Sequence, residues 1–124
     1  FRAKIIILPV EVRQVVLEAC RHFDETKYRL WAVVVMPDHV HLLLTPLEKT
    51  GGGYYSLAEI LHSLKSFTGS RINRLLKRQG KVWQEDYFNR IVRDEGEFLE
   101  KWNYIRNNPV KKDLCQYPEE WDGF

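Results

Sequence analysis

Two histidines one residue apart are the residues of this chain whose types and spacing point most directly to chemistry. His39 and His41 lie in a mostly apolar run, MPDHVHLLL at residues 36–44. Successive side chains of a β-strand point to opposite faces, so both imidazoles are predicted to point the same way. Neutral imidazole is the commonest protein ligand for metals, and two on one face can bind one divalent ion. Histidines satisfied by hydrogen bonds at a strand end are commoner for an isolated pair, so the spacing alone leaves both interpretations open.

A tyrosine and an asparagine form a second candidate set near the end of the chain. Tyr104 and Asn108 are four residues apart in the segment WNYIRNNP at 102–109, a spacing that puts both on one face of a helix. Pro109 disfavours helical geometry for the residue before it, so Asn108 is predicted to end the helix with its amide oxygen free to coordinate an ion. Taken alone, a tyrosine at the core edge and an asparagine cap are the more frequent roles.

The elements that must position these residues follow from hydrophobic periodicity and turn signals. Pro37 and Asp38 predict a tight turn between two strands, and Ser56 with Glu59 forms a capping box that opens a long helix ending near Gly80. The last helix is predicted to bury Phe98, Leu99, Trp102 and Ile105. The predicted helices cover about 9–23, 56–80 and 95–107, and the predicted strands cover about 5–8, 28–36, 39–45, 82–83 and 87–92.

This order of elements predicts an α+β fold: an antiparallel sheet with helices packed on one face, ferredoxin-like in type, with the first strand only partly present. A length of 124 residues with 44% hydrophobic content predicts one domain over 1–124. No apolar run is long enough to span a bilayer, and no signal peptide is found. Cys20 and Cys115 are far apart without a CxxC pair, which argues against a disulfide scaffold or zinc knuckle and favours a cytoplasmic setting.

Positive charge is concentrated in the middle of the chain. Residues 56–93 contain eight Lys and Arg against three Asp and Glu, a net +5, whereas residues 94–124 contain four against eight, a net −4. The basic region is a candidate phosphate-facing surface, and a solvated helix face is an equal alternative on charge alone.

Four segments in order resemble the single-tyrosine HUH transposases, specifically the REP-associated branch. They are MPDHVHLLL (36–44), SLAEILHSLKSFTGSRINR (56–74), VWQEDYFNRIVRD (82–94) and YIRNNPVK (104–111). The resemblance implies a ferredoxin-like core in which His39, His41 and Asn108 bind Mg²⁺ or Mn²⁺. It implies that Tyr104 attacks DNA to give a 5′-phosphotyrosine and a free 3′-hydroxyl, and that rejoining reverses this step.

The resemblance also implies single-stranded or hairpin DNA, such as REP-like repeats, as the partner. The residues expected to hold its phosphates are Lys65, Arg71, Arg74 and Lys77. Aromatic residues available to stack on bases, or to pack in the core instead, are Tyr54, Tyr55, Trp83, Tyr87 and Phe88.

Two other functions stay open from the sequence. One is a domesticated module that binds DNA hairpins without cleaving them. The other is a metal-dependent phosphodiesterase in which the same ligands activate water and Tyr104 only positions phosphate. The sequence leaves the choice between monomer and homodimer open and does not identify the base that deprotonates the tyrosine.

Overall fold

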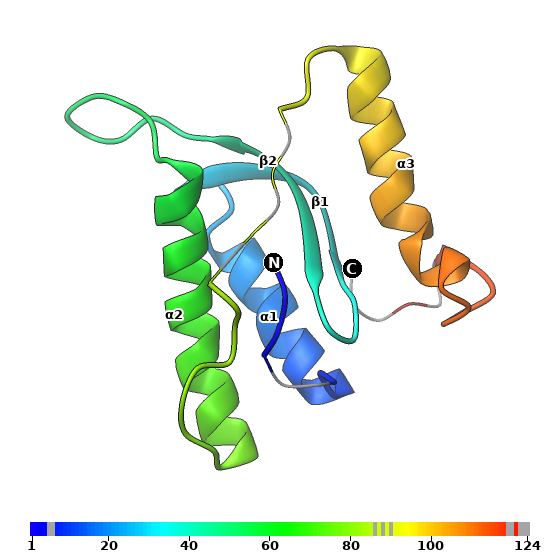
Figure 1. The fold of residues 1–124 in the computed structure, drawn as a ribbon. Coiled ribbons are helices and arrows are strands. Elements are labelled where there is room, and N and C mark those ends of the chain that lie inside the picture. The colour runs from blue at the N-terminus through cyan, green and yellow to red at the C-terminus, as the bar shows by residue number, and fades with distance from the viewer. Residues whose placement is uncertain (5–6, 86, 88, 90, 119–120, 122–124) are drawn as a thin grey trace.

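The computed structural model describes residues 1–4, 7–85, 87, 89, 91–118 and 121. Its elements follow in the order α1 (Val10–His22), β1 (Tyr28–Val35), β2 (Val40–Pro46), α2 (Leu57–Leu76) and α3 (Glu95–Lys111) (Figure 1). The predicted α+β class is therefore confirmed. The predicted strand at 87–92 lies partly outside the described residues, and those of its residues that are described form no strand.

β1 and β2 form an antiparallel hairpin at the centre of the molecule. Val35 pairs with Val40 and Val34 pairs with His41, and the register shifts once between Leu30 and Ala32. β-branched and aromatic residues dominate β1 because they fit a pleated surface that is covered on both sides. The predicted turn at residues 37–38 is confirmed, and the Met36 amide donates to the His39 carbonyl across it, with an N–O distance of 2.8 Å.

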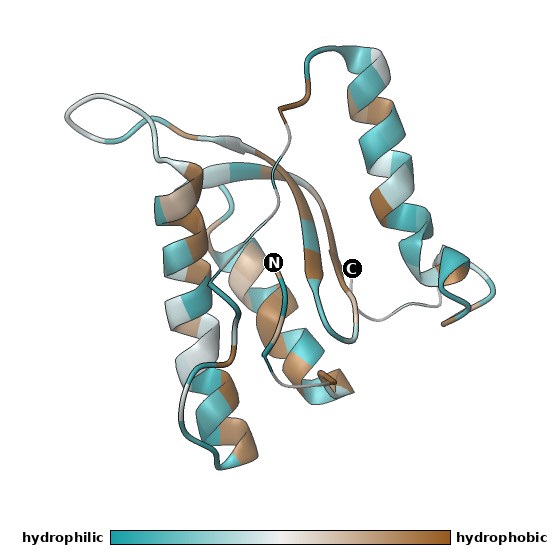
Figure 2. Ribbon diagram, in the orientation of Figure 1, coloured by the Kyte–Doolittle hydropathy of each residue, from teal (hydrophilic) through white to brown (hydrophobic). Residues whose placement is uncertain are grey.

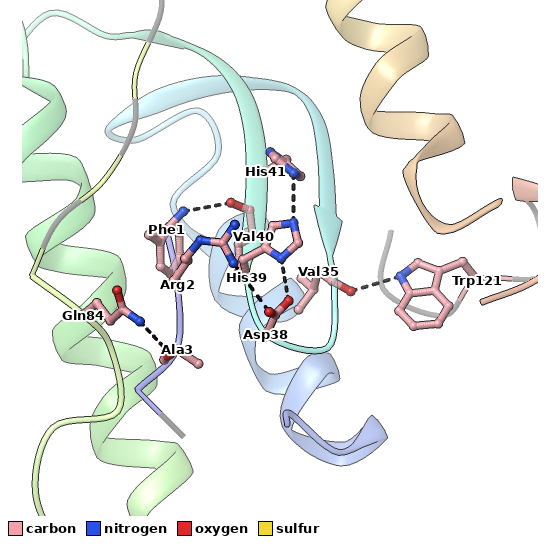
Figure 3. Close-up of polar contacts among 10 residues, drawn as sticks. All are labelled: Phe1, Arg2, Ala3, Val35, Asp38, His39, Val40, His41, Gln84 and Trp121. Atoms are coloured by element: carbon pink, nitrogen blue, oxygen red, sulfur yellow. Dashed lines mark hydrogen bonds and ion pairs between the residues drawn. The ribbon is translucent and has the colours of Figure 1, made fainter. Parts of the chain in front are cut away.

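Two short segments extend this sheet beyond β2. Arg2 forms an antiparallel bridge with His39, and Ala3 forms one with Trp83. The Val40 amide donates to the Phe1 carbonyl at 2.8 Å, so the first residues of the described chain lie directly beside the histidine strand (Figure 3). The short strand predicted at 82–83 is thus present as a single bridge.

The helices cover both faces of the hairpin rather than one. Val33 and Val35 of β1 pack into a core with α1 and α2, whereas the alternating residue Val34 packs with Ile105 of α3. Figures 1 and 2 show α1 and α2 next to each other on one side of the hairpin and α3 on the other side, with hydrophobic bands on both strands. The expectation of helices on a single face holds for α1 and α2, while α3 lies on the opposite face, because β1 is apolar on both of its sides.

The helix ends agree with the sequence at the start of α2 and differ at two other ends. The capping box at Ser56 and Glu59 is confirmed, and α2 ends at Leu76, before Gly80, with Lys77 in a left-handed conformation. The prediction that Pro109 ends the last helix is wrong, since α3 continues to Lys111. Proline lacks an amide hydrogen and disfavours helical geometry for the residue before it, yet the Lys112 amide still closes a turn on the Asn108 carbonyl at 3.0 Å.

The face that α3 buries is also narrower than predicted. Ile105 is buried, but Leu99 is 58% exposed and Trp102 is 36% exposed. Helical spacing alone did not show how little of α3 touches the sheet. Within the described part of the chain, no helix is long and apolar enough to cross a membrane.

Candidate metal and nucleophile site

The two histidines meet at the turn end of the hairpin. Their Nε2 atoms are 3.0 Å apart, and their rings lie edge to face with centroids 4.7 Å apart (Figure 3). The prediction that both imidazoles share one side of the strand is confirmed. The short distance requires that at most one of the two Nε2 atoms carries a proton.

A carboxylate lies on the other side of His39. The Nδ1 atom of His39 is 2.6 Å from Oδ1 of Asp38, and Oδ2 of Asp38 is 3.5 Å from the Arg2 guanidinium. Partial burial raises the pKa of Asp38, but the hydrogen bond and charge of His39 outweigh this and bring the pKa below its ordinary value. An ionised carboxylate only accepts hydrogen bonds, so Nδ1 of His39 is the donor and a neutral His39 has its lone pair on Nε2.

His41 is held in its neutral form. Burial is the main cause that lowers its pKa to about 4, and interactions with His39, the Phe1 amino group and Arg2 lower it further. A charged imidazole has no lone pair for a metal, so a low pKa keeps His41 competent as a ligand at neutral pH.

α3 places Tyr104 next to His41 of this pair. The Tyr104 ring centroid is 5.6 Å from that of His41, at an interplanar angle of 85°. The phenol is 48% exposed, and the Lys111 ammonium lies 5.9 Å from its ring centroid. Tyr104, although far along the chain, therefore lies next to the histidine strand. Its ring is accessible to solvent and close to the Lys111 ammonium.

Asn108 lies one helical turn after Tyr104 and is almost completely buried. It is 3% exposed, and its Oδ1 atom has no hydrogen-bond partner among the described residues. A buried carbonyl oxygen without a partner costs about 1–3 kcal/mol, so such an atom in a native protein calls for an explanation. A bound cation is one, because amide oxygens are suitable ligands for Mg²⁺ and Mn²⁺.

By their chemistry, two neutral imidazoles and the Asn108 amide oxygen would suit a divalent ion. No cluster of three or more His, Cys, Asp or Glu side chains occurs in the described ranges of the chain. Two neutral imidazoles and one amide oxygen leave coordination positions for water or a substrate oxygen, which is the arrangement that a catalytic metal needs.

A groove runs from the histidines along β2. It has a volume of about 1160 Å³, and its walls include β2, the start of α2, Gln84, Tyr87, Asn89 and residues 91–95. Arg2 and Arg93 line it together with Trp31 and Tyr87. The sequence interpretation missed Arg2 and Trp31 and counted Arg93 only as part of the basic region 56–93, since only the folded chain brings these distant residues together.

The four predicted phosphate-binding residues are not gathered at one place. Lys65 lies nearest the groove, where its ammonium donates to the Gln84 carbonyl at 2.7 Å and lies 5.8 Å from the Tyr87 ring centroid. Arg71 instead stacks on Phe67 at 4.2 Å, on the side of α2 that meets the end of α1. Arg74 is in the last turn of α2 and Lys77 caps it. These residues are spread over different sides of α2 and do not form a single patch beside the histidines.

Comparison with known proteins gives this geometry its context. Residues 2–108 match the family described as "Transposase IS200 like". The chain belongs to this transposase family. It is similar to a Haemophilus influenzae protein named "Putative REP-associated tyrosine transposase", with 26% identity over 117 residues that cover 90% of this chain and 64% of that protein. A second, uncharacterized protein of the same organism is 26% identical over 98 residues, which cover 66% of this chain and 54% of that protein.

A solved structure shares the fold of this transposase chain. It is described as a REP-associated tyrosine transposase bound to a REP hairpin, and it matches with a TM-score of 0.73 at 17% identity, over 97% of this chain and 69% of that chain. The chain thus spans less than two thirds of the length of both curated relatives and somewhat more of the structural one.

Proposed function

We propose that this chain is the catalytic core of a transposase that cleaves and rejoins single-stranded or hairpin DNA through a tyrosine. The observation that carries the proposal is the contact between a half-exposed tyrosine on α3 and the histidine pair on the hairpin, with 5.6 Å between the Tyr104 and His41 ring centroids. A half-exposed phenol is open to substrate in a way that a core tyrosine is not.

His39, His41 and Asn108 are the residues that would hold Mg²⁺ or Mn²⁺. The ion, when bound, would neutralise charge on a nonbridging phosphate oxygen and make the phosphorus a better electrophile. Binding requires an unprotonated Nε2 on both histidines. Since the proton of His39 is on Nδ1, a ligand role for His41 would place its proton on Nδ1 as well, because the two Nε2 atoms are 3.0 Å apart.

Tyr104 is the proposed nucleophile. Its Oη atom attacks phosphorus and loses its proton, a bond forms between Oη and phosphorus, and the 3′ oxygen of the DNA leaves with the bonding electrons and takes up a proton. The Lys111 ammonium lies 5.9 Å from the Tyr104 ring centroid, so the proposed nucleophile has a positive charge beside its ring. The reverse attack by the 3′-hydroxyl rejoins DNA without external energy.

The groove along β2 is the proposed path for the DNA strand. It presents guanidinium groups for phosphates and aromatic rings for bases, the two features that single-strand binding needs. Lys65, Arg71, Arg74 and Lys77 would then contact phosphates of a longer or hairpin substrate along α2. A hairpin is the substrate class we favour, because the solved structure that shares this fold is described with one.

The test is to trap the covalent intermediate. The protein is incubated with Mn²⁺ and hairpin DNA that carries a single-stranded extension with its label on the side retained by the tyrosine. An adduct that survives denaturant is expected for the wild-type chain and for Tyr117→Phe, the control at another exposed tyrosine. Tyr104→Phe is expected to form none.

The two alternative functions give different results in the same assay. Cleavage without an adduct, unaffected by Tyr104→Phe, would identify a phosphodiesterase that uses water. Binding of the hairpin without cleavage at any Mn²⁺ concentration would identify a binding module. Either result would contradict the proposal.

A further inference from the structure

Asp38 makes three contacts beside the proposed metal site. One of its oxygens is 2.6 Å from His39 Nδ1, and the other is 3.5 Å from the Arg2 guanidinium. Its backbone carbonyl accepts from the Ala3 amide at 2.9 Å. The residue is thus held by the segment beside β2 while its carboxylate contacts the back of a histidine ring (Figure 3).

We propose that Asp38 is a positioning residue for the metal site, which fixes the tautomer and the ring orientation of His39 so that Nε2 is directed at the position shared with His41. This inference rests on the proposed function, because it concerns the ligands of the same ion. It extends that function to a residue which would not touch the ion, the DNA or the tyrosine.

The chemistry of the two groups supports this role. A neutral imidazole has one N–H, and a carboxylate at Nδ1 holds that hydrogen there, so Nε2 keeps its lone pair. Without an acceptor at Nδ1, the proton can move to Nε2 and block it, and the ring is free to rotate about its χ2 angle. Carboxylates that accept from the second nitrogen of a metal-binding histidine orient the ring in this way, and their loss weakens metal binding by about 10–100-fold.

Arg2 contributes to the position of Asp38 without carrying the role itself. The ion pair lies at the surface, with the side chains 60% and 52% exposed, and such pairs contribute little energy. The bridge between Arg2 and His39 nevertheless places the guanidinium on the outer oxygen of Asp38, which leaves the inner oxygen for His39. Removal of Arg2 should therefore weaken metal binding much less than removal of Asp38.

The test measures Mn²⁺ affinity by calorimetry in the absence of DNA, for the wild-type chain and for Asp38→Ala, Asp38→Asn and Arg2→Ala. Asp38→Ala is expected to weaken binding about 10–100-fold. Asp38→Asn should recover most of the affinity, because its amide oxygen still accepts from Nδ1. Glu48→Ala, which removes the same charge at an exposed residue after β2, should have no effect. Thermal unfolding verifies that each variant is folded.

A second readout needs no metal. Imidazole ¹⁵N chemical shifts report which nitrogen of His39 is protonated, and the wild-type chain and Asp38→Asn should show the proton on Nδ1. Asp38→Ala should show a mixture or the other tautomer. Equal Mn²⁺ affinity for Asp38→Ala and Glu48→Ala, or an unchanged ¹⁵N pattern in Asp38→Ala, would overturn the role of Asp38 and leave the proposed function standing. Absence of Mn²⁺ binding by the wild-type chain would overturn the metal site and with it both proposals.

Discussion

The two faces of the β1–β2 hairpin pack into hydrophobic cores of very different size. Among the described residues, the core shared by the hairpin, α1 and α2 contains seventeen buried hydrophobic residues, whereas the core beneath α3 contains four: Val34, Met36, Leu43 and Ile105. The histidines belong to the hairpin, and Tyr104 and Asn108 belong to α3. The proposed ligands His39 and His41 are thus carried by a hairpin whose other face is anchored in the large core, while the nucleophile is carried by a lightly attached helix.

This difference predicts that stability and catalysis depend on different faces. Substitutions on the α1 and α2 face should lower the free energy of unfolding of the whole chain. Substitutions on the α3 face should release the helix and impair the site at a smaller cost in stability.

The largest effect is expected from Leu64→Ala in α2, because Leu64 is fully buried in the large core. A leucine-to-alanine change at such a position leaves a cavity and costs about 3 kcal/mol. Denaturant unfolding followed by circular dichroism measures it. Leu99→Ala is the matched control on α3, where the side chain is 58% exposed, and should change stability by less than about 0.5 kcal/mol.

Ile105→Ala should cost about 2 kcal/mol, at the lower end of the range for buried aliphatic residues, because the core beneath α3 is small. Its distinctive effect is local. Amide hydrogen exchange should accelerate throughout α3 while α1 and α2 keep their protection. Equal acceleration in all three helices would show that the two faces unfold as one unit and would contradict the contrast.

The large core should also make the chain sensitive to alkali through Cys20. Burial raises the pKa of this thiol from 9.0 to about 12, so the unfolded chain loses its proton first as the pH rises. This contribution to stability is complete below pH 9 and is lost progressively from there to about pH 12, which amounts to about 1 kcal/mol by pH 10. Stability measured against pH should fall less steeply in Cys20→Ala than in Cys115→Ala, the control at a partly exposed cysteine.

Asn108→Leu should separate stability from function most clearly. The substitution removes the buried Oδ1 atom that has no hydrogen-bond partner in the described structure, so we expect stability to stay equal or to rise by up to about 1 kcal/mol. Mn²⁺-dependent cleavage should nevertheless be lost, because the amide ligand is gone. Loss of stability by more than 1 kcal/mol would show that Asn108 is structural, and retained cleavage would exclude it as a ligand.

Local sequence signals predicted most of the elements and the two halves of the site. Strand alternation placed His39 and His41 together, helical spacing paired Tyr104 with Asn108, and the capping box fixed the start of α2. These features depend on a few neighbouring residues, so they can be deduced from the chain itself. The roles of the four site residues remain proposals.

Features that depend on tertiary packing were predicted less well. α3 lies on the second face of the hairpin because both sides of β1 are covered. A run of valines does not show which helix covers which side. Pro109 lies inside α3 because the surrounding packing outweighs its local preference. Asp38 stands directly before His39 in the sequence, yet only the turn geometry shows that its carboxylate reaches Nδ1.

The proposed metal site requires that the hairpin and α3 hold one ion together, within reach of the tyrosine. Paramagnetic broadening by Mn²⁺ tests it directly in NMR spectra of the chain at a substoichiometric ion concentration. If the ion is shared, the Asn108 side-chain amide and the Tyr104 ring should lose intensity together with His39 and His41, well before the exposed Tyr54 ring does, and His41→Ala should abolish the effect. Broadening confined to the histidines, with Tyr104 and Asn108 unaffected, would contradict it.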